Sequence, residues 1–119
     1  MTQFLGRAKI SANGKTIETA PGASLDLGGV KNNTVVTGSK IGRAEELVPS
    51  VINCTTSLEA GMSLEDLRNL KDATVMFECD TGQSYVIRNA FRTDTTTLKD
   101  GAGGEVTLVI NGDPAEELL

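Results

Sequence analysis

The chain has 119 residues, enough for one domain with a buried core, and we expect a single domain over residues 1–119. Aromatic residues make up only 3% of the sequence, which predicts an aliphatic core and argues against aromatic platforms for stacking single-stranded bases. The net charge of −5 argues against electrostatic affinity for nucleic acid, and the absence of histidine removes the commonest general base and metal ligand.

The first predicted elements are two short strands, over residues 7–12 and 15–20, on either side of Asn13-Gly14. Asn-Gly between alternating segments predicts a type I′ hairpin, because both central residues of that turn need positive φ. Pro21-Gly22 then ends this part of the sheet.

The segment over residues 23–50 is polar and rich in glycine, with one β-branched patch at 34–37. We interpret residues 28–48 as a long extended loop that orders against a partner, since such segments in compact domains are usually functional or disordered. A mobile surface loop is the alternative, against which the apolar residues of the segment argue. The candidate contact residues are Val35, Val36, Lys40, Ile41, Arg43, Glu45, Glu46 and Leu47.

One strand and one helix are predicted next. Residues 51–58 are rich in β-branched side chains and form the strand. Ser63 is a suitable N-cap for a short helix that ends near Lys71, with acidic residues in its first turn. Its apolar stripe consists of Leu64, Leu67 and Leu70.

Residues 73–92 alternate in polarity and predict a hairpin, which a polar loop containing 101–104 connects to a last strand over 105–111. An acidic tail follows at 113–119. The fold class is therefore mainly β, a barrel or sandwich with one short α-helix and a long extended loop. The period-2 positions predict a core of Ile10, Ile17, Ile52, Cys54, Val75, Phe77, Tyr85, Ile87, Phe91, Val106, Leu108 and Ile110.

The turn of this hairpin, Asp80-Thr81-Gly82, has the letters of an aspartic protease signature. In a small dimeric protease two such aspartates approach and share a proton. Here Gln83 follows and Glu78-Cys79 precede, which does not fit an apolar setting, and no hydrophobic-hydrophobic-glycine segment braces the site. The triplet fits a tight turn with Gly82 at positive φ, so we expect Asp80 to be non-catalytic.

The remaining motifs predict no catalytic, cofactor-binding or metal-binding residues. The glycines of residues 101–104 precede a strand and lack the Lys-Ser/Thr of a phosphate loop. The acidic pairs lack the spacing of a calcium loop, and two cysteines are too few for a disulfide framework. No apolar run is long enough to span a membrane and no signal-peptide core is present, so we expect a protein that stays in the cytoplasm where it is made.

Taken in order, these segments resemble the tail tube proteins of Mu-like contractile-tailed phages. The ordered set carries the resemblance, rather than any one motif, and it covers nearly the whole chain. The matching stretches are Phe4–Lys9, Asn13–Lys15, Cys54-Thr55, Gly61–Leu67, Ala73–Val86, Gly103–Val109 and the Pro-Ala-Glu-Glu of the tail.

This resemblance implies a single tail tube domain that forms hexameric rings, which stack into a hollow tube inside a contractile sheath. It implies a virion protein, assembled in the host bacterial cytoplasm, whose channel passes genome DNA during infection. Implied partners are the sheath protein, the baseplate hub, the tail terminator and the tape measure protein, with no membrane and no cofactor. Residues 28–48 are then expected to make contacts between subunits, most of them between rings.

Two other function classes fit the sequence less well. One is the small homodimeric aspartic protease, which would use Asp80. The other is a non-catalytic β-domain that serves as an adaptor for a partner. Electron microscopy of concentrated protein separates the three, since they predict rings or tubes, dimers with cleavage activity, and isolated monomers.

Overall fold

The computed structural model describes residues 2–57, 65–93, 95, 97–101 and 104–118. In these ranges the regular structure is mostly β-strand, with one short helix, α1 (Glu65–Arg68). The strands are β1 (Ala8–Ala12), β2 (Lys15–Ile17), β3 (Ser24–Asp26), β4 (Gly29–Thr37), β5 (Lys40–Val48), β6 (Ser50–Ser57), β7 (Ala73–Cys79), β8 (Ser84–Arg92), β9 (Thr97–Lys99), β10 (Glu105–Gly112) and β11 (Glu116–Leu118).

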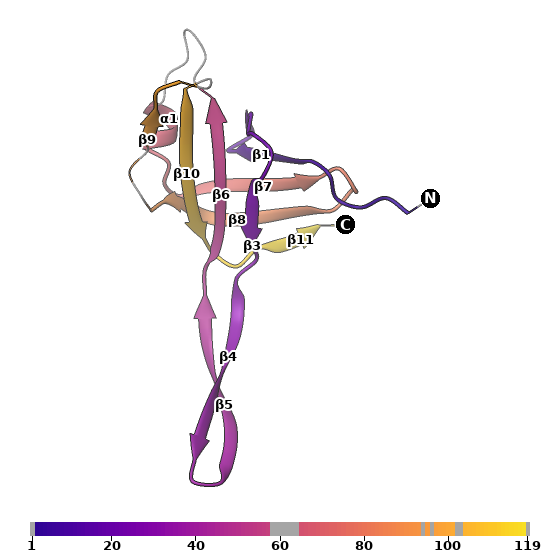
Figure 1. The fold of residues 1–119 in the computed structure, drawn as a ribbon, viewed down its shortest axis with the longest axis vertical. Coiled ribbons are helices and arrows are strands. Elements are labelled where there is room, and N and C mark those ends of the chain that lie inside the picture. The colour runs from indigo at the N-terminus through magenta and orange to yellow at the C-terminus, as the bar shows by residue number, and fades with distance from the viewer. Residues whose placement is uncertain (1, 58–64, 94, 96, 102–103, 119) are drawn as a thin grey trace.

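All strands except β4 and β5 belong to one hydrogen-bonded path of order β2-β1-β7-β8-β10-β6-β3, with β11 paired to β8 and β9 to β10. The path folds into two layers, because β8 meets β10 through only two residue pairs, Arg92 with Ile110 and Phe91 with Asn111. In Figure 1 the layer of β6 and β10 runs across the layer of β7 and β8. This arrangement is a sandwich with crossed layers, so the predicted mainly β fold class is confirmed.

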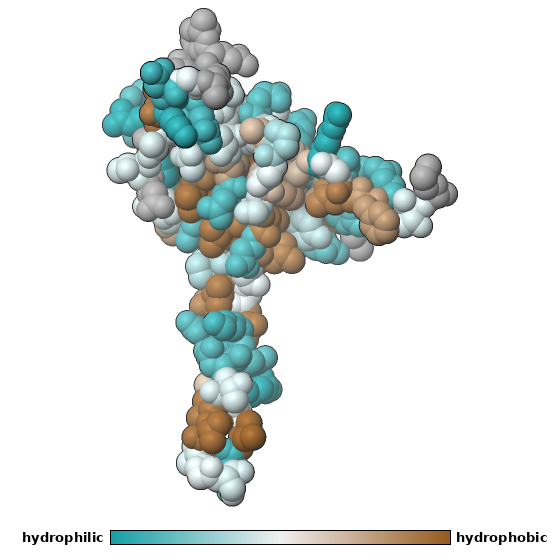
Figure 2. All heavy atoms as spheres, in the orientation of Figure 1, coloured by the Kyte–Doolittle hydropathy of each residue, from teal (hydrophilic) through white to brown (hydrophobic). Residues whose placement is uncertain are grey.

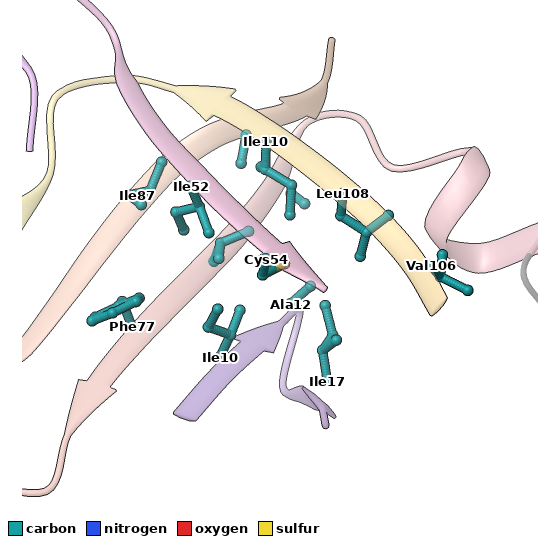
Figure 3. Close-up of a cluster of buried hydrophobic side chains, with 13 residues drawn as sticks. Ile10, Ala12, Ile17, Ile52, Cys54, Phe77, Ile87, Val106, Leu108 and Ile110 are labelled. Carbon is teal, nitrogen blue, oxygen red and sulfur yellow. The ribbon is translucent and has the colours of Figure 1, made fainter. Parts of the chain in front are cut away.

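The core lies between the two layers and is aliphatic, as the composition predicts (Figure 3). Ten of the twelve predicted core residues are buried, including Ile10, Ile52 and Val106 at 0% exposure. In strands β6 and β10 every second residue is buried and the residues between are half-buried or exposed, which is why period-2 reasoning works for them. The sequence analysis missed several small core residues: Ala12, Ser50, Thr56, Ala73, Val86 and Ala90.

Two predicted core residues on β8 are misplaced. Tyr85 is only half-buried, and Phe91 is 46% exposed. For Phe91 the cause is an irregularity in the β7–β8 ladder, where the register shifts between Ala73 and Val75 while Asn89 adopts φ of +53°. Tyr85 lies outside this irregularity, opposite Phe77 in the regular part of the ladder. Between the pairs Val75–Ile87 and Ala73–Ala90, β8 contains one residue more than β7. This extra residue reverses the alternation after Ile87, so that Ala90 is buried in place of Phe91.

Both predicted tight turns are present. Asn13 and Gly14 have φ of +51° and +80° between the paired residues Ala12 and Lys15, as a type I′ turn requires. At the β7–β8 turn Gly82 has φ of +103° and its N–H donates to the Cys79 carbonyl at 3.1 Å. The Asp-Thr-Gly triplet is therefore a hairpin turn.

Other predicted elements differ from the structure. The segment expected as a long loop is a regular hairpin of β4 and β5, and part of the expected acidic tail is strand β11, which pairs with β8. Part of the polar loop before the last strand is β9. The helix ends at Arg68 rather than near Lys71, and the predicted cap Ser63 lies outside the described residues.

Candidate assembly surface

The β4–β5 hairpin projects from the rest of the chain, here called the body, as Figure 1 shows. Nine residue pairs run from Gly29 with Val48 to Thr37 with Lys40, and in the part of the chain that the structure describes these strands pair only with each other. Gly38, with φ of +61°, and Ser39 form the two-residue turn. Glycine at the first central position is the requirement of a type II′ turn, so the Gly-Ser pair was the sequence signal for this hairpin.

The hairpin has two faces because side chains alternate along each strand. One face, here called the Val36 face, carries two apolar cross-strand pairs: Val36 with Ile41 near the turn, and Val30 with Leu47 near the body. These four side chains are 62–76% exposed. The two pairs are separated by six residues along β4, about 20 Å. Figure 2 shows the same pattern, with apolar surface near each end of the hairpin and hydrophilic surface between.

A polar network occupies the middle of the Val36 face. The Arg43 guanidinium donates to Asn32 Oδ1 and Glu45 Oε1, both at 2.9 Å. On the opposite face Asn33 Nδ2 donates to Glu46 Oε2 at 2.8 Å. Exposed pairs of this kind contribute little to folding stability, so the network fixes side-chain positions more than it holds the hairpin together.

Five predicted contact residues therefore share the Val36 face: Val36, Ile41, Arg43, Glu45 and Leu47. The other three, Val35, Lys40 and Glu46, lie on the opposite face. The sequence analysis missed Val30, which completes the apolar pair near the body.

The hairpin and the body differ in their balance of charged residues. Residues 29–48 contain three basic and two acidic residues, whereas the remainder of the chain contains eight basic and fourteen acidic residues. Within the hairpin Arg43 is paired with Glu45, so Lys40 is the basic residue beside the turn. A basic tip thus extends from an acidic body, which is a complementary arrangement for copies of one chain.

The hairpin leaves the body at Gly28, whose backbone has φ of +69°. A Cβ at this position would lie 2.7 Å from backbone atoms of Val48, Pro49 and Ser50. The Gly28 N–H donates to Asp26 Oδ1 at 3.1 Å, and the Ala115 N–H donates to the Leu27 carbonyl at 2.9 Å. The two strands therefore meet at a close backbone approach that only glycine permits.

Asp80 holds the N-terminal segment against the β7–β8 turn. Its carboxylate accepts the backbone N–H of Arg7 at 3.0 Å and that of Gly6 at 3.3 Å, and its own N–H donates to the Arg7 carbonyl at 3.1 Å. The carboxylate thus acts as an acceptor for main-chain donors, a structural role that does not require a second aspartate.

The same segment forms one wall of a groove of about 520 Å³, here called the N-terminal groove. Strand β3 and the turn-proximal ends of β7 and β8 form the rest. Its apolar lining includes Phe4, Leu5, Leu25, Leu27, Phe77 and Tyr85. Phe4 is 82% exposed, Leu5 55% and Leu27 46%, so the rim of this groove is an exposed apolar surface on the body.

The side chains with shifted pKa values form no catalytic arrangement among the described residues. A hydrogen bond to the Glu117 carboxylate raises the pKa of the Tyr85 hydroxyl, which links β8 to β11. Burial raises the pKa of the Cys54 thiol to about 11, and burial followed by the charge of Asp80 raises the pKa of Cys79. Neutral thiols are poor nucleophiles.

Two further kinds of site are absent from the described residues. No group of three or more Cys, Asp or Glu side chains is placed to hold a metal ion there. No helix in the same ranges is long and apolar enough to cross a membrane.

Comparison with known proteins identifies relatives over nearly the whole chain. The sequence model of the phage tail tube protein family matches residues 1–117. The chain is 35% identical over 107 residues to the Mu-like prophage FluMu tail tube protein of Haemophilus influenzae, covering 90% of this chain and 89% of the relative. It is 29% identical over 109 residues to the tail tube protein of Escherichia phage Mu, with 91% and 89% covered.

Solved structures share the fold at low sequence identity. The tube terminating cap of the anti-feeding prophage aligns with a TM-score of 0.73 and 11% identity, covering 99% of this chain and 93% of the cap protein. A chain of the sheath-tube complex of an extracellular contractile injection system aligns with a TM-score of 0.69 and 14% identity, covering 94% and 88%.

Proposed function

This chain belongs to the phage tail tube protein family, a family of structural virion proteins rather than enzymes, and we propose that it forms hexameric rings that stack into a tube. The tube encloses a channel through which genome DNA passes during infection. Tail sheath and terminator proteins are its expected neighbours, consistent with the sheath, tube and terminator assemblies in which proteins of similar fold are found. The baseplate hub and the tape measure protein complete the proposed set of partners.

The observation that carries this proposal is the exposed hairpin. It has apolar pairs at both ends, and no residue of it is buried in the isolated chain. A two-stranded hairpin is marginal in water by itself, and exposed apolar surface of this kind marks a contact site. We therefore propose that the eight residues named above lie between subunits, mostly between stacked rings, within a single domain spanning residues 1–119.

Charge and sheet edges agree with this role. An acidic chain lining a channel repels DNA, so the DNA does not adhere during transit. Among the described residues, strands β2, β3, β9 and β11 each pair with one named strand, so each has an outer backbone edge that a neighbouring subunit in a ring is able to cover.

Assembly of the purified protein tests the proposal. Negative-stain electron microscopy of concentrated protein is expected to show rings or tubes, with sedimentation above the monomer in analytical ultracentrifugation. Deletion of residues 33–41 is expected to leave a folded subunit that builds no long tubes. The double variant Val36→Thr with Ile41→Thr is the matched test, because it keeps β-branched side chains in the hairpin and removes apolar area.

Monomers alone from the unaltered chain at high concentration, with and without tail-tip components, would count against the proposal. Normal tubes from the deletion would place the stacking contacts elsewhere. Proteolytic activity that disappears in Asp80→Asn would restore the protease hypothesis, which the occupied carboxylate of Asp80 argues against.

A further inference from the structure

We propose that the tip of the β4–β5 hairpin of one copy docks in the N-terminal groove of a second copy of this chain. The inference rests on the proposed self-assembly and names the surface that receives the hairpin. The tip is the Val36 and Ile41 pair with the flanking Lys40, and the groove is the one walled by Phe4, Leu5 and Leu27.

The tip needs a partner from outside its own chain. Val36 is 65% exposed and Ile41 is 76% exposed, and they are adjacent across the ladder. Strands β4 and β5 pair only with each other among the described elements, and the hairpin extends away from the body in Figure 1. Its own groove lies on the body, so a second copy has to supply the surface that covers the tip.

The groove has the chemistry and size to receive the tip. Its floor includes the half-buried Leu25 and Tyr85 and the buried Phe77, while its rim exposes Phe4 and Leu27. The volume of about 520 Å³ falls in the range of pockets that enclose small ligands, about 300–1,000 Å³. An aliphatic pair such as Val36 and Ile41 would remove apolar surface of both partners from water.

Charge favours a copy of this chain as the occupant. Lys40 gives the tip a positive charge, and Tyr85 in the groove lining makes a hydrogen bond to the Glu117 carboxylate. The body as a whole has six more acidic than basic residues, so the electrostatic attraction acts between tip and body.

The contact propagates because tip and groove are different surfaces. A copy whose groove is filled still presents its own tip to a third copy, which is the heterologous geometry that builds rings and tubes. Asp80 serves this contact as a positioning residue, since its bonds to Gly6 and Arg7 hold the segment that bears Phe4 and Leu5. The Asp-Thr-Gly motif thus shapes the groove.

A cysteine at the tip tests the pairing, because the native Cys79 lines the groove. Ile41→Cys is assembled into tubes, oxidised mildly and separated on denaturing gels without reductant. Disulfides between copies are expected, giving a ladder of covalent oligomers that reductant collapses. Ile41→Cys combined with Cys79→Ser is expected to give no ladder, and Ala44→Cys, on the opposite face of the hairpin, is the matched control.

Tubes that need the hairpin but give no Cys79-dependent ladder would overturn this inference and leave the proposed function intact. A chain that never assembles would instead contradict the proposed function. Leu27→Asp supplies a second measurement, with Leu98→Asp as control, since these leucines are 46% and 51% exposed and Leu98 lies outside the groove. At least a tenfold loss of tube yield is expected for Leu27→Asp alone, and wild-type yield from that variant would overturn the inference.

Discussion

The body and the β4–β5 hairpin are built from the same kind of strand but differ in what stabilises them. In the body, strands from both layers bury Ile10, Ile52, Phe77 and Ile110 between them. In the hairpin, nine regular residue pairs bury no side chain, and each end carries an exposed apolar pair. Backbone pairing is thus present in both regions, and burial in only one.

The difference shows that this chain separates folding from assembly. The body has the core that a stable domain needs, whereas a lone hairpin requires further strands or packing to be stable in water. Substitutions in the body should therefore lower the free energy of unfolding. Substitutions on the Val36 face should lower assembly and leave the isolated subunit unchanged.

The largest expected effect on folding comes from the body. Phe77 is 5% exposed in the core, so Phe77→Ala should lower the free energy of unfolding by about 3–5 kcal/mol through lost burial and a cavity. Urea denaturation of the isolated subunit measures the change. A loss below about 1 kcal/mol would show that the two layers close over the cavity.

A substitution at the junction between the body and the hairpin should lower the free energy of unfolding by less than Phe77→Ala does. Gly28→Ala places a Cβ against the backbone of Val48 and Ser50 at positive φ, which costs about 1–3 kcal/mol in strain and redirects the hairpin. Gly42→Ala is the control, because a Cβ there meets no atom within 4 Å. We expect Gly28→Ala to lose tubes and stability and Gly42→Ala to keep the stability. Equal unfolding curves for the two variants would mean that the backbone at the junction shifts to accommodate the Cβ without loss of stability.

Loss of the Asp80 contact should lower the free energy of unfolding by less than the Gly28 substitution does. Asp80→Ala removes the acceptor of the Gly6 and Arg7 N–H groups at an exposed site, for a loss of about 0.5–1.5 kcal/mol. Asp80→Asn retains one acceptor oxygen and should fold and assemble. Amide hydrogen exchange at Arg7 reports the contact directly and should accelerate in Asp80→Ala. Unchanged exchange in that variant would show that the N-terminal segment is held by its other contacts.

The smallest effect on folding is expected at the tip. Ile41→Ser should change the free energy of unfolding of the subunit by less than about 0.5 kcal/mol, because Ile41 is 76% exposed. The same variant should reduce tube growth, as measured by sedimentation. A large loss of stability in the isolated subunit would break the distinction between a body that folds and a hairpin that assembles.

Local patterns in the sequence determined much of the body. Asn13-Gly14 specified its turn because few residues other than Gly and Asn accept positive φ, and the alternation of β6 and β10 specified which side chains enter the core. The Asp80-Thr81-Gly82 turn was also predicted from its residues. The family was predicted from the ordered set of segments, and the match over residues 1–117 confirms it.

Tertiary structure decided the rest, because those features depend on contacts distant in sequence. The irregularity near Asn89 reversed the phase of β8 and exposed Phe91, and the free edge of β8 made a strand of Glu116–Leu118. Polar residues of β4 and β5 gave no periodic signal, since neither face of that hairpin is buried in the chain. Likewise Asp80 gained its role only when the fold placed the Arg7 amide beside it, 73 residues away in sequence.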